Sequence, residues 1–289
     1  MCRFIVYVGE PITLESLITL PRNSLIHQSI QAEEFDERLN GDGFGVAWYA
    51  PEVSAEPAVF RGITPAWSNR NLLSLVRVVR SPCILAHVRA ATPGMAVTET
   101  NCHPFARGAY AFLHNGHVGD FAAVRRPLRR ALTDASYDAI EGSTDSELLF
   151  ALFLDCMLAH SRMPPAEGLA GALEATIHRV LDLQREFGTG QASYLNLGVT
   201  DGVHAAATRF TDGAPEDALS LYYHSGRRYV CDGEVCRMVP SASGTASTLI
   251  CSERLSDDGG WTAVPANHLV MVQADRTVAA RPIRTPGGA

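Results

Sequence analysis

The spacing of apolar residues predicts mostly strands in the first half of the chain, then two long helices, then strands again. The run at residues 2–8 is apolar with β-branched side chains and predicts a strand. Further strands are expected at 43–49, 57–62, 83–88, 109–113, 193–200, 203–208, 219–224, 227–231, 248–251 and 268–272. Helical spacing occurs at 12–20, at 71–79, from Thr144 to Cys156 and at 166–186. This order lacks the regular strand–helix alternation of a doubly wound parallel sheet, so it favours a layered α+β fold.

The first long helix has a clear start signal at Thr144-Asp145-Ser146-Glu147. This is the form of a capping box, in which the Thr144 hydroxyl and the Glu147 carboxylate accept hydrogen bonds from unpaired backbone amides. An aspartate in the first helical turn commonly serves the helix dipole. The alternative is that Asp145 holds an ammonium group of a substrate.

Composition indicates a globular protein that does not bind nucleic acid. The 289 residues are 46% apolar and 19% charged, with a formal net charge of -7. The densest basic cluster, Arg125-Arg126 with Arg129-Arg130, fits one solvated helix face.

The loops, at 51–56, 161–165 and 211–217, are too short for interdomain linkers. A single domain over 1–289 with a short flexible tail at about 284–289 is therefore expected.

The cysteines and the chain start predict a cytoplasmic protein. The apolar stretch after Arg3 is short and does not resemble a signal peptide, and no run is long enough to span a bilayer. Seven scattered cysteines do not form a disulfide framework, and free thiols are expected. Cys231 and Cys236 have no second pair nearby, so a zinc site there is not expected.

Cys2 is the first candidate for chemistry. If Met1 is removed, Cys2 carries both a thiol and the free α-amine. An α-amine has a pKa of about 7.7–8.0, so it can accept a proton near neutral pH without a separate histidine. The alternative is that Cys2 simply begins a buried strand, because free cysteine is often buried.

Three further motifs each have a structural and a functional interpretation. Asn40-Gly41-Asp42-Gly43-Phe44-Gly45 is a poor dinucleotide fingerprint, and it predicts a tight turn or a backbone that approaches a ligand. Arg89, in the segment 86–94, is either a solvated charge at a strand end or a clamp for a carboxylate.

The third motif is His114-Asn115-Gly116-His117. Asn-Gly is a common hairpin turn signal, but an Asn side chain and the next backbone N–H can also form an oxyanion hole. The two histidines have no matching acidic motif, so no metal is expected there. The chain has no GxSxG or HExxH motif to supply a rival mechanism.

Taken in order, these motifs resemble the class II glutamine amidotransferases, which are N-terminal-nucleophile hydrolases. The likeness rests on Cys2, the 40–45 motif, His87-Val88-Arg89-Ala90-Ala91-Thr92, His114-Asn115-Gly116 and Ser143-Thr144-Asp145-Ser146-Glu147. Two C-terminal segments, Cys251 to Trp261 and Val264 to Val270, resemble the stand-alone γ-glutamyl branch, so the likeness covers nearly the whole chain. That branch includes the ergothioneine-pathway amidohydrolase and the amidotransferase-like subunit of glutathione degradation. Some members have tryptophan where this chain has Ala90.

The resemblance implies a four-layer αββα sandwich and a role for each matching residue. Cys2 would be the nucleophile and its α-amine the proton acceptor. Asn115 and the Gly116 amide would form the oxyanion hole. Arg89, with Thr92 beside it, would bind the α-carboxylate of a glutamyl group, and Asp145 would hold its α-ammonium.

The resemblance also implies the activity, which is hydrolysis of a γ-glutamyl amide bond in glutamine, glutathione or a related peptide or thiol. The reaction would proceed through a γ-glutamyl thioester and release glutamate, with no metal and no cofactor. One alternative is a glutaminase subunit that supplies ammonia to a separate synthetase. Another is a non-catalytic γ-glutamyl-binding or regulatory protein. A partner peptidase or synthetase subunit is compatible with the sequence, whereas nucleic-acid and membrane partners are not expected.

Overall fold

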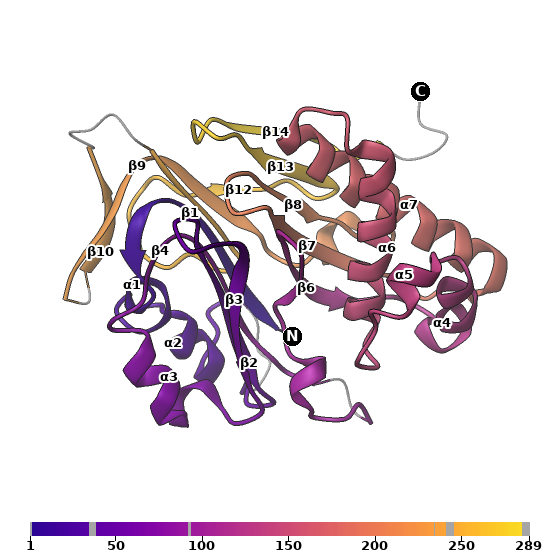
Figure 1. Ribbon diagram of the computed structural model, residues 1–289, viewed down its shortest axis with the longest axis horizontal. Helices are drawn as coiled ribbons and strands as arrows, with labels where there is room; N and C mark the ends of the chain where they lie inside the picture. The colour runs from indigo at the N-terminus through magenta and orange to yellow at the C-terminus, as the bar shows by residue number, and fades with distance from the viewer. Residues whose placement is uncertain (1, 35–38, 92–93, 234, 241–245, 285–289) are drawn as a thin grey trace.

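Two antiparallel sheets stacked face to face form the centre of the protein (Figure 1). The structure is a computed structural model that describes residues 2–34, 39–91, 94–233, 235–240 and 246–284. The first sheet has the strand order β10-β9-β11-β1-β4-β2-β3, with β12 paired to β9. The second has the order β14-β13-β8-β7-β6-β5.

The strands match most of the sequence expectations. Those of the first sheet are β1 (Arg3–Thr13), β2 (Phe44–Ala50), β3 (Ser54–Gly62), β4 (Arg80–Val88), β9 (Tyr222–Asp232), β10 (Val235–Val239), β11 (Ser247–Cys251) and β12 (Thr262–Ala263). Those of the second are β5 (Phe105–Arg107), β6 (Tyr110–His117), β7 (Tyr194–Thr200), β8 (Ala205–Arg209), β13 (His268–Val272) and β14 (Val278–Pro282).

Helices cover the outer face of each sheet. The helices are α1 (Glu15–Ile18), α2 (Leu25–Ile30), α3 (Arg70–Leu75), α4 (Phe121–Arg130), α5 (Asp134–Tyr137), α6 (Asp145–His160) and α7 (Pro165–Phe187). Short 3₁₀ turns lie at Ala66–Ser68, Glu99–Asn101 and Pro215–Asp217. The helices α1 to α3 pack on the first sheet, and α4, α6 and α7 pack on the second. The four-layer αββα sandwich is therefore confirmed.

The side chains of β1 show how the layers are held together. Successive side chains of a strand point to opposite faces. Phe4 and Val6 lie in the core between the two sheets, whereas Ile5 and Tyr7 pack under the helices of the first sheet. Because both faces of β1 are buried, its sequence is an apolar run without strict alternation.

The helix α6 is buried on nearly all sides. Leu148, Leu149, Phe150, Ala151, Leu152 and Phe153 are all buried. A helix that is apolar all round belongs inside a protein. Here α6 lies against α7 and β6, and this fixes the helix N-terminus near the end of β6.

The structure corrects four expectations. The two strands expected at 219–224 and 227–231 are one strand, β9, which continues through Gly226 in a left-handed conformation (φ 99°). The helix α4 was not among the ranges expected from apolar spacing, although it carries the basic cluster Arg125-Arg126 with Arg129-Arg130 that was expected on one helix face. The helix expected at 12–20 is only the single turn α1, because β1 continues as far as Thr13.

The fourth correction concerns the cysteines. Cys231 and Cys236 face each other on β9 and β10 and form a disulfide, so the expectation of free thiols was wrong for this pair. The hairpin register, which the sequence spacing does not reveal, brings them together. Cys2, Cys83, Cys102, Cys156 and Cys251 remain as free thiols.

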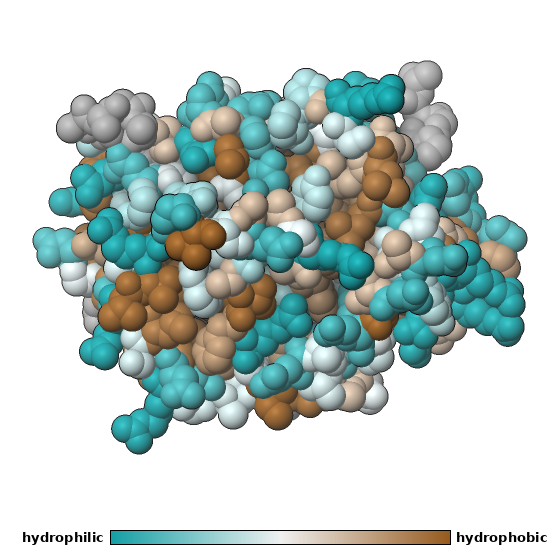
Figure 2. Space-filling view, in the orientation of Figure 1, coloured by the Kyte–Doolittle hydropathy of each residue, from teal (hydrophilic) through white to brown (hydrophobic). Residues whose placement is uncertain are grey.

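Hydrophilic and hydrophobic residues are interspersed over the face of the molecule seen in Figure 2. In the part of the chain that the structure describes, no helix combines the length and the apolar character that crossing a membrane requires.

Buried histidines predict a pH dependence of stability. Burial lowers the pKa of His87 to about 3, and burial also lowers the pKa values of His103 and His114. In the unfolded chain these three histidines bind protons below a pH of about 6.5, whereas in the folded chain they stay neutral to a lower pH, so acidification favours unfolding. The free energy of unfolding should fall between pH 6.5 and 4, by about 1.4 kcal/mol per pH unit for each fully depressed histidine.

Urea unfolding at several pH values measures this slope. His87→Gln should make it shallower, and the matched change His27→Gln at an exposed histidine should leave it unchanged. Equal slopes for the wild type and His87→Gln would contradict the account.

Candidate functional site

Cys2 lies at the start of the central strand β1, beside the end of β4. Because β1 and β4 are antiparallel, Arg3 pairs with Val88, the last residue of β4. The half-buried Cys2 thiol donates a hydrogen bond to the Ala90 carbonyl oxygen, with an Sγ–O distance of 3.6 Å. Burial raises the pKa of the Cys2 thiol, so the thiol is protonated at neutral pH.

A buried ion pair fixes the backbone next to Cys2. The Arg3 guanidinium donates from Nε to Glu253 Oε1 at 2.6 Å and from Nη1 to the Cys2 carbonyl oxygen at 2.9 Å. The two side chains are 1% and 0% exposed. The other Glu253 oxygen accepts from the Glu33 amide at 2.9 Å. The ion pair therefore joins the start of β1 to two segments that are distant in the sequence.

Arg89 follows directly after β4 and is buried. Its guanidinium donates to the carbonyl oxygens of Asp42 and Ala96 over 3.4–3.5 Å. Among the described residues, no carboxylate lies within ion-pair distance of it. A buried guanidinium with long bonds to carbonyls alone retains the capacity to bind a carboxylate bidentately.

The glycine-rich motif shapes the loop that carries Arg89. Asp42 accepts from the Ala91 amide through Oδ2 at 2.8 Å, and the Asp42 amide donates to the Arg89 carbonyl oxygen at 3.0 Å. Gly43 has a φ of 116°, which side-chain-bearing residues rarely adopt. The segment bends at Asp42 before it enters β2, and its backbone pairs with the Arg89 segment. Thr92, expected beside Arg89, lies outside the described residues.

Asn115 and Gly116 are part of β6 and do not form a hairpin turn. They pair with Asn196 and Leu195 of β7. Asn115 is 1% exposed, and its Oδ1 accepts no hydrogen bond from the described residues. Gly116 has a φ of 141°, and a Cβ there would lie 1.8 Å from the Tyr194 carbonyl oxygen, so only glycine fits.

His114 is a neutral structural residue. Its Nε2 lies 3.1 Å from the Tyr194 carbonyl oxygen, which can only accept, so Nε2 carries the proton. Its Nδ1 then accepts from the Ser146 hydroxyl at 2.9 Å. Burial lowers the pKa of His114, which agrees with the neutral form. His114 thus ties β6 to the first turn of α6.

Asp145 occupies the first turn of α6, close to the end of β6. Its Oδ2 accepts from the Val118 amide at 2.9 Å, and its Oδ1 accepts from the Ser146 amide at 2.8 Å. Half of the expected capping box is confirmed, because the Thr144 hydroxyl accepts from the Glu147 amide. The Glu147 carboxylate instead accepts from the amides of Glu141 and Gly142.

Asn101, which belongs to none of the sequence motifs, connects the Arg89 and Asp145 segments. Its Nδ2 donates to the Ala96 carbonyl oxygen at 3.0 Å, the same oxygen that Arg89 contacts. Its Oδ1 accepts from the Ser143 amide at 2.9 Å, two residues before Asp145. Asn101 belongs to a short 3₁₀ turn without periodicity, so no sequence pattern marks it.

The ends of β1 and β6 face each other across the two sheets. These strands contact each other, and a Cβ at Gly198 would lie 3.5 Å from the Phe4 ring and 3.7 Å from the Leu113 side chain. Phe4 is two residues from Cys2, and Leu113 is two residues from Asn115. The structure therefore brings Cys2, Arg89, Asn115, Gly116 and Asp145 to one end of the sandwich.

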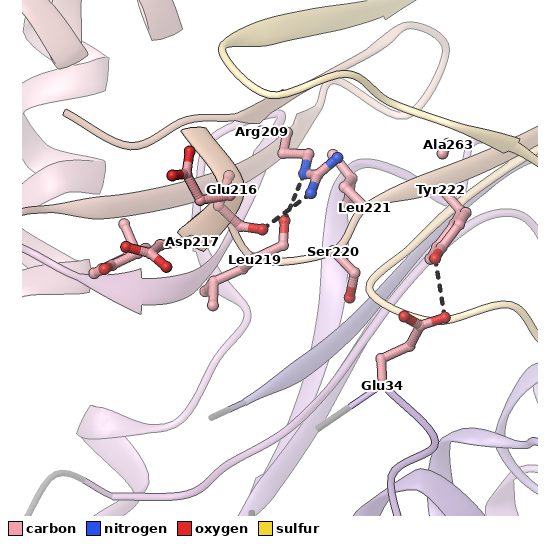
Figure 3. A pocket seen from close by; sticks show the side chains of 11 residues that line it. Glu34, Arg209, Glu216, Asp217, Leu219, Ser220, Leu221, Tyr222 and Ala263 are labelled. Atoms are coloured by element: carbon pink, nitrogen blue, oxygen red, sulfur yellow. Dashed lines mark hydrogen bonds between the residues drawn. The ribbon is translucent and has the colours of Figure 1, made fainter. Parts of the chain in front are cut away.

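A cavity of about 720 Å³ lies beside this end (Figure 3). It is lined mainly by the segment 216–222, with Glu34, Tyr194, Arg209 and Ala263. The Asn196 side chain, opposite Asn115, donates to the carbonyl oxygens of Leu219 and Ser220 at 3.2 and 3.0 Å. The cavity wall is therefore anchored directly to the strand pair that carries Asn115.

Comparison with known proteins shows what the chain is similar to. The family model of class II glutamine amidotransferases matches residues 15–214. The probable glutamine amidotransferase DUG3 of Saccharomyces cerevisiae is 37% identical over 304 residues, covering 98% of this chain and 84% of that protein. The γ-glutamyl-hercynylcysteine sulfoxide hydrolase of Mycolicibacterium smegmatis is 28% identical over 274 residues, covering 94% and 96%. A solved structure of a glutamine aminotransferase class-II domain protein from Silicibacter pomeroyi has a TM-score of 0.67 at 30% identity, covering 99% of this chain and 100% of that one.

The Arg3–Glu253 pair gives a stability prediction. Glu253→Gln removes one charge of this buried ion pair and should lower the free energy of unfolding by about 3–5 kcal/mol. The matched control is Asp257→Asn in the exposed pair with Arg22, where the side chains are 64% and 72% exposed. That change should cost less than about 1 kcal/mol. Urea unfolding measures both values, and equal losses would show that the buried pair does not anchor this region.

Proposed function

The chain belongs to the class II glutamine amidotransferases, and on that premise we propose that it hydrolyses γ-glutamyl amides through a thioester on Cys2. A γ-glutamyl amide carries an α-carboxylate and an α-ammonium at one end and the scissile carbonyl at the other. The best support is the gathering of a thiol, a buried guanidinium and a buried carboxylate at one end of the sandwich. The similarity to a γ-glutamyl-hercynylcysteine sulfoxide hydrolase points to the same chemistry.

Cys2 is the nucleophile, and its own α-amine is the base. The thiol is protonated at neutral pH because burial raises its pKa, so it must lose a proton to attack. Among the described residues its one hydrogen-bond partner is a backbone carbonyl, with no imidazole or carboxylate in contact. The α-amine that becomes free when Met1 is removed supplies the missing base, since its pKa of about 7.7–8.0 suits proton transfer near neutrality.

Asn115 and Gly116 stabilise the oxyanion. The Asn115 amide is buried and held on a strand, so it can be aimed in advance at the developing charge. The conformation of Gly116, which only glycine fits, sets the direction of its backbone amide. Loss of one such donor in comparable sites costs roughly 10²–10³ in rate.

Arg89 and Asp145 hold the two charges of the glutamyl head. Arg89 binds the α-carboxylate, with Thr92 as its neighbour, and Asp145 binds the α-ammonium. Asn101 sets the spacing between them, because its side-chain amide bonds both segments. With both charges fixed, the γ-carbonyl reaches Cys2 with little orientational freedom.

The reaction then proceeds in two steps. The thiolate sulfur bonds to the γ-carbonyl carbon, the carbon–nitrogen bond breaks, and the proton taken up by the α-amine passes to the leaving amine. Water then attacks the thioester carbonyl, releases glutamate and restores the thiol. No metal or cofactor takes part in this scheme.

Cys2→Ala tests the proposal. It should lower the release of glutamate from glutamine and from γ-glutamyl peptides by at least about a thousandfold. Cys156→Ala, at a buried thiol within α6, should retain activity. Full activity of Cys2→Ala would refute the mechanism. The assay uses the lone chain, so activity that appears only with a co-purifying protein would instead favour a subunit of a larger enzyme.

A further inference from the structure

We propose that the cavity of Figure 3 binds the leaving amine of the substrate and prefers an amine that carries an additional positive charge. This inference rests on the proposed function, because it assigns the second half of the same substrate. It concerns the residues that surround the leaving group. Neither the residues that bind the glutamyl head (Arg89 and Asp145) nor the oxyanion hole contacts that part of the substrate.

The cavity is joined to both sides of the reacting centre. On one side, the Ser220 hydroxyl donates to the Ser252 carbonyl oxygen at 2.8 Å, and the Ser252 hydroxyl accepts from the Phe4 amide at 3.0 Å. Phe4 lies two residues after Cys2. On the other side, Asn196 anchors the cavity wall and is paired with Asn115. A group leaving the γ-carbonyl therefore has this cavity next to it.

The size of the cavity points to a substrate larger than glutamine. A volume of about 720 Å³ lies within the usual range for small-molecule pockets. Ammonia, the amine that glutamine releases, would leave almost all of it unfilled. A peptide-sized or similarly large amine would fill it.

The lining of the cavity is mainly acidic. Glu34, Glu216 and Asp217 contribute three carboxylates, against one guanidinium from Arg209. The carboxylates of Glu216 and Asp217 form no hydrogen bond or ion pair with other described residues. In the view of Figure 3, Arg209 lies between Glu216 on one side and the Tyr222–Glu34 pair on the other.

The Arg209 guanidinium forms its hydrogen bonds with backbone carbonyl groups. It donates to the carbonyl oxygens of Leu219, Val264 and Ala218 at 2.7–3.0 Å, and so holds the cavity wall in place. Glu34 accepts from the Tyr222 hydroxyl at 2.9 Å, and the Arg254 guanidinium lies 5.7 Å from the Tyr222 ring. The charged side chains of the lining that remain available to a ligand are therefore mostly carboxylates. This favours a cationic amine over an amine that ends in a carboxylate.

Three γ-glutamyl amides of equal chain length test the preference. Their leaving groups are 1,4-diaminobutane, butylamine and 4-aminobutanoate, which end in an ammonium, a methyl and a carboxylate group. Each kcat/KM is divided by the value for glutamine, which has no group to place in the cavity. The ammonium-ended amide should have the highest ratio and the carboxylate-ended amide the lowest, and added salt should narrow the difference.

The double variant Glu216→Gln with Asp217→Asn should reduce the preference for the ammonium-ended over the butyl amide roughly two- to tenfold. Its activity on glutamine should not change. The matched control, Glu56→Gln with Asp138→Asn, neutralises two exposed carboxylates outside the cavity lining and should preserve the preference.

The outcomes separate the two proposals. Suppose that glutamine is hydrolysed, but the kcat/KM ratios of the three amides are equal or follow the reverse order, or the double variant does not change the preference for the ammonium-ended amide. The cavity assignment is then wrong, and the proposed function stands. If neither glutamine nor any of the three amides is hydrolysed, the proposed function fails, and the cavity assignment fails with it.

Discussion

The buried ion pair between Arg3 and Glu253 is the constraint on which the site depends. It brings together the start of β1, the segment after β11 and the segment that contains Glu33. Taking two charges out of water is costly, and the cost is recovered only when geometry and additional hydrogen bonds are favourable. Here the bonds to the Cys2 carbonyl and the Glu33 amide satisfy that condition, so the pair fixes the position of Cys2.

The other groups of the site are held by hydrogen bonds that cross between elements. His114 ties β6 to α6, and Asn101 ties the Arg89 loop to the segment before Asp145. His114 links the end of a strand to the start of a helix, and Asn101 links two loop segments, where regular secondary structure leaves backbone groups unpaired. In the proposed mechanism, this network holds in place Arg89 and Asp145, the two residues that bind the charges of the γ-glutamyl head.

Much of this could be predicted from the sequence, and the rest could not for identifiable reasons. Apolar runs gave most strands and both long helices, and ordered motifs singled out Cys2, Arg89 and Asp145. The strand β6 continues through Asn115-Gly116 because β7 pairs with it, which overrides the local turn preference of Asn-Gly. The contact of Glu253 with Arg3 spans 250 residues, and no local pattern encodes such a pairing.

The central claim is that Cys2 with its own free α-amine is the reacting group. Treating the protein with 6-diazo-5-oxo-norleucine, a glutamine-like electrophile, and locating the adduct by peptide mass spectrometry tests this directly. The account predicts one adduct on Cys2, formed rapidly in chains that lack Met1 and slowly or not at all in chains that retain it. An adduct on another residue, or equal labelling with Met1 retained, would contradict it.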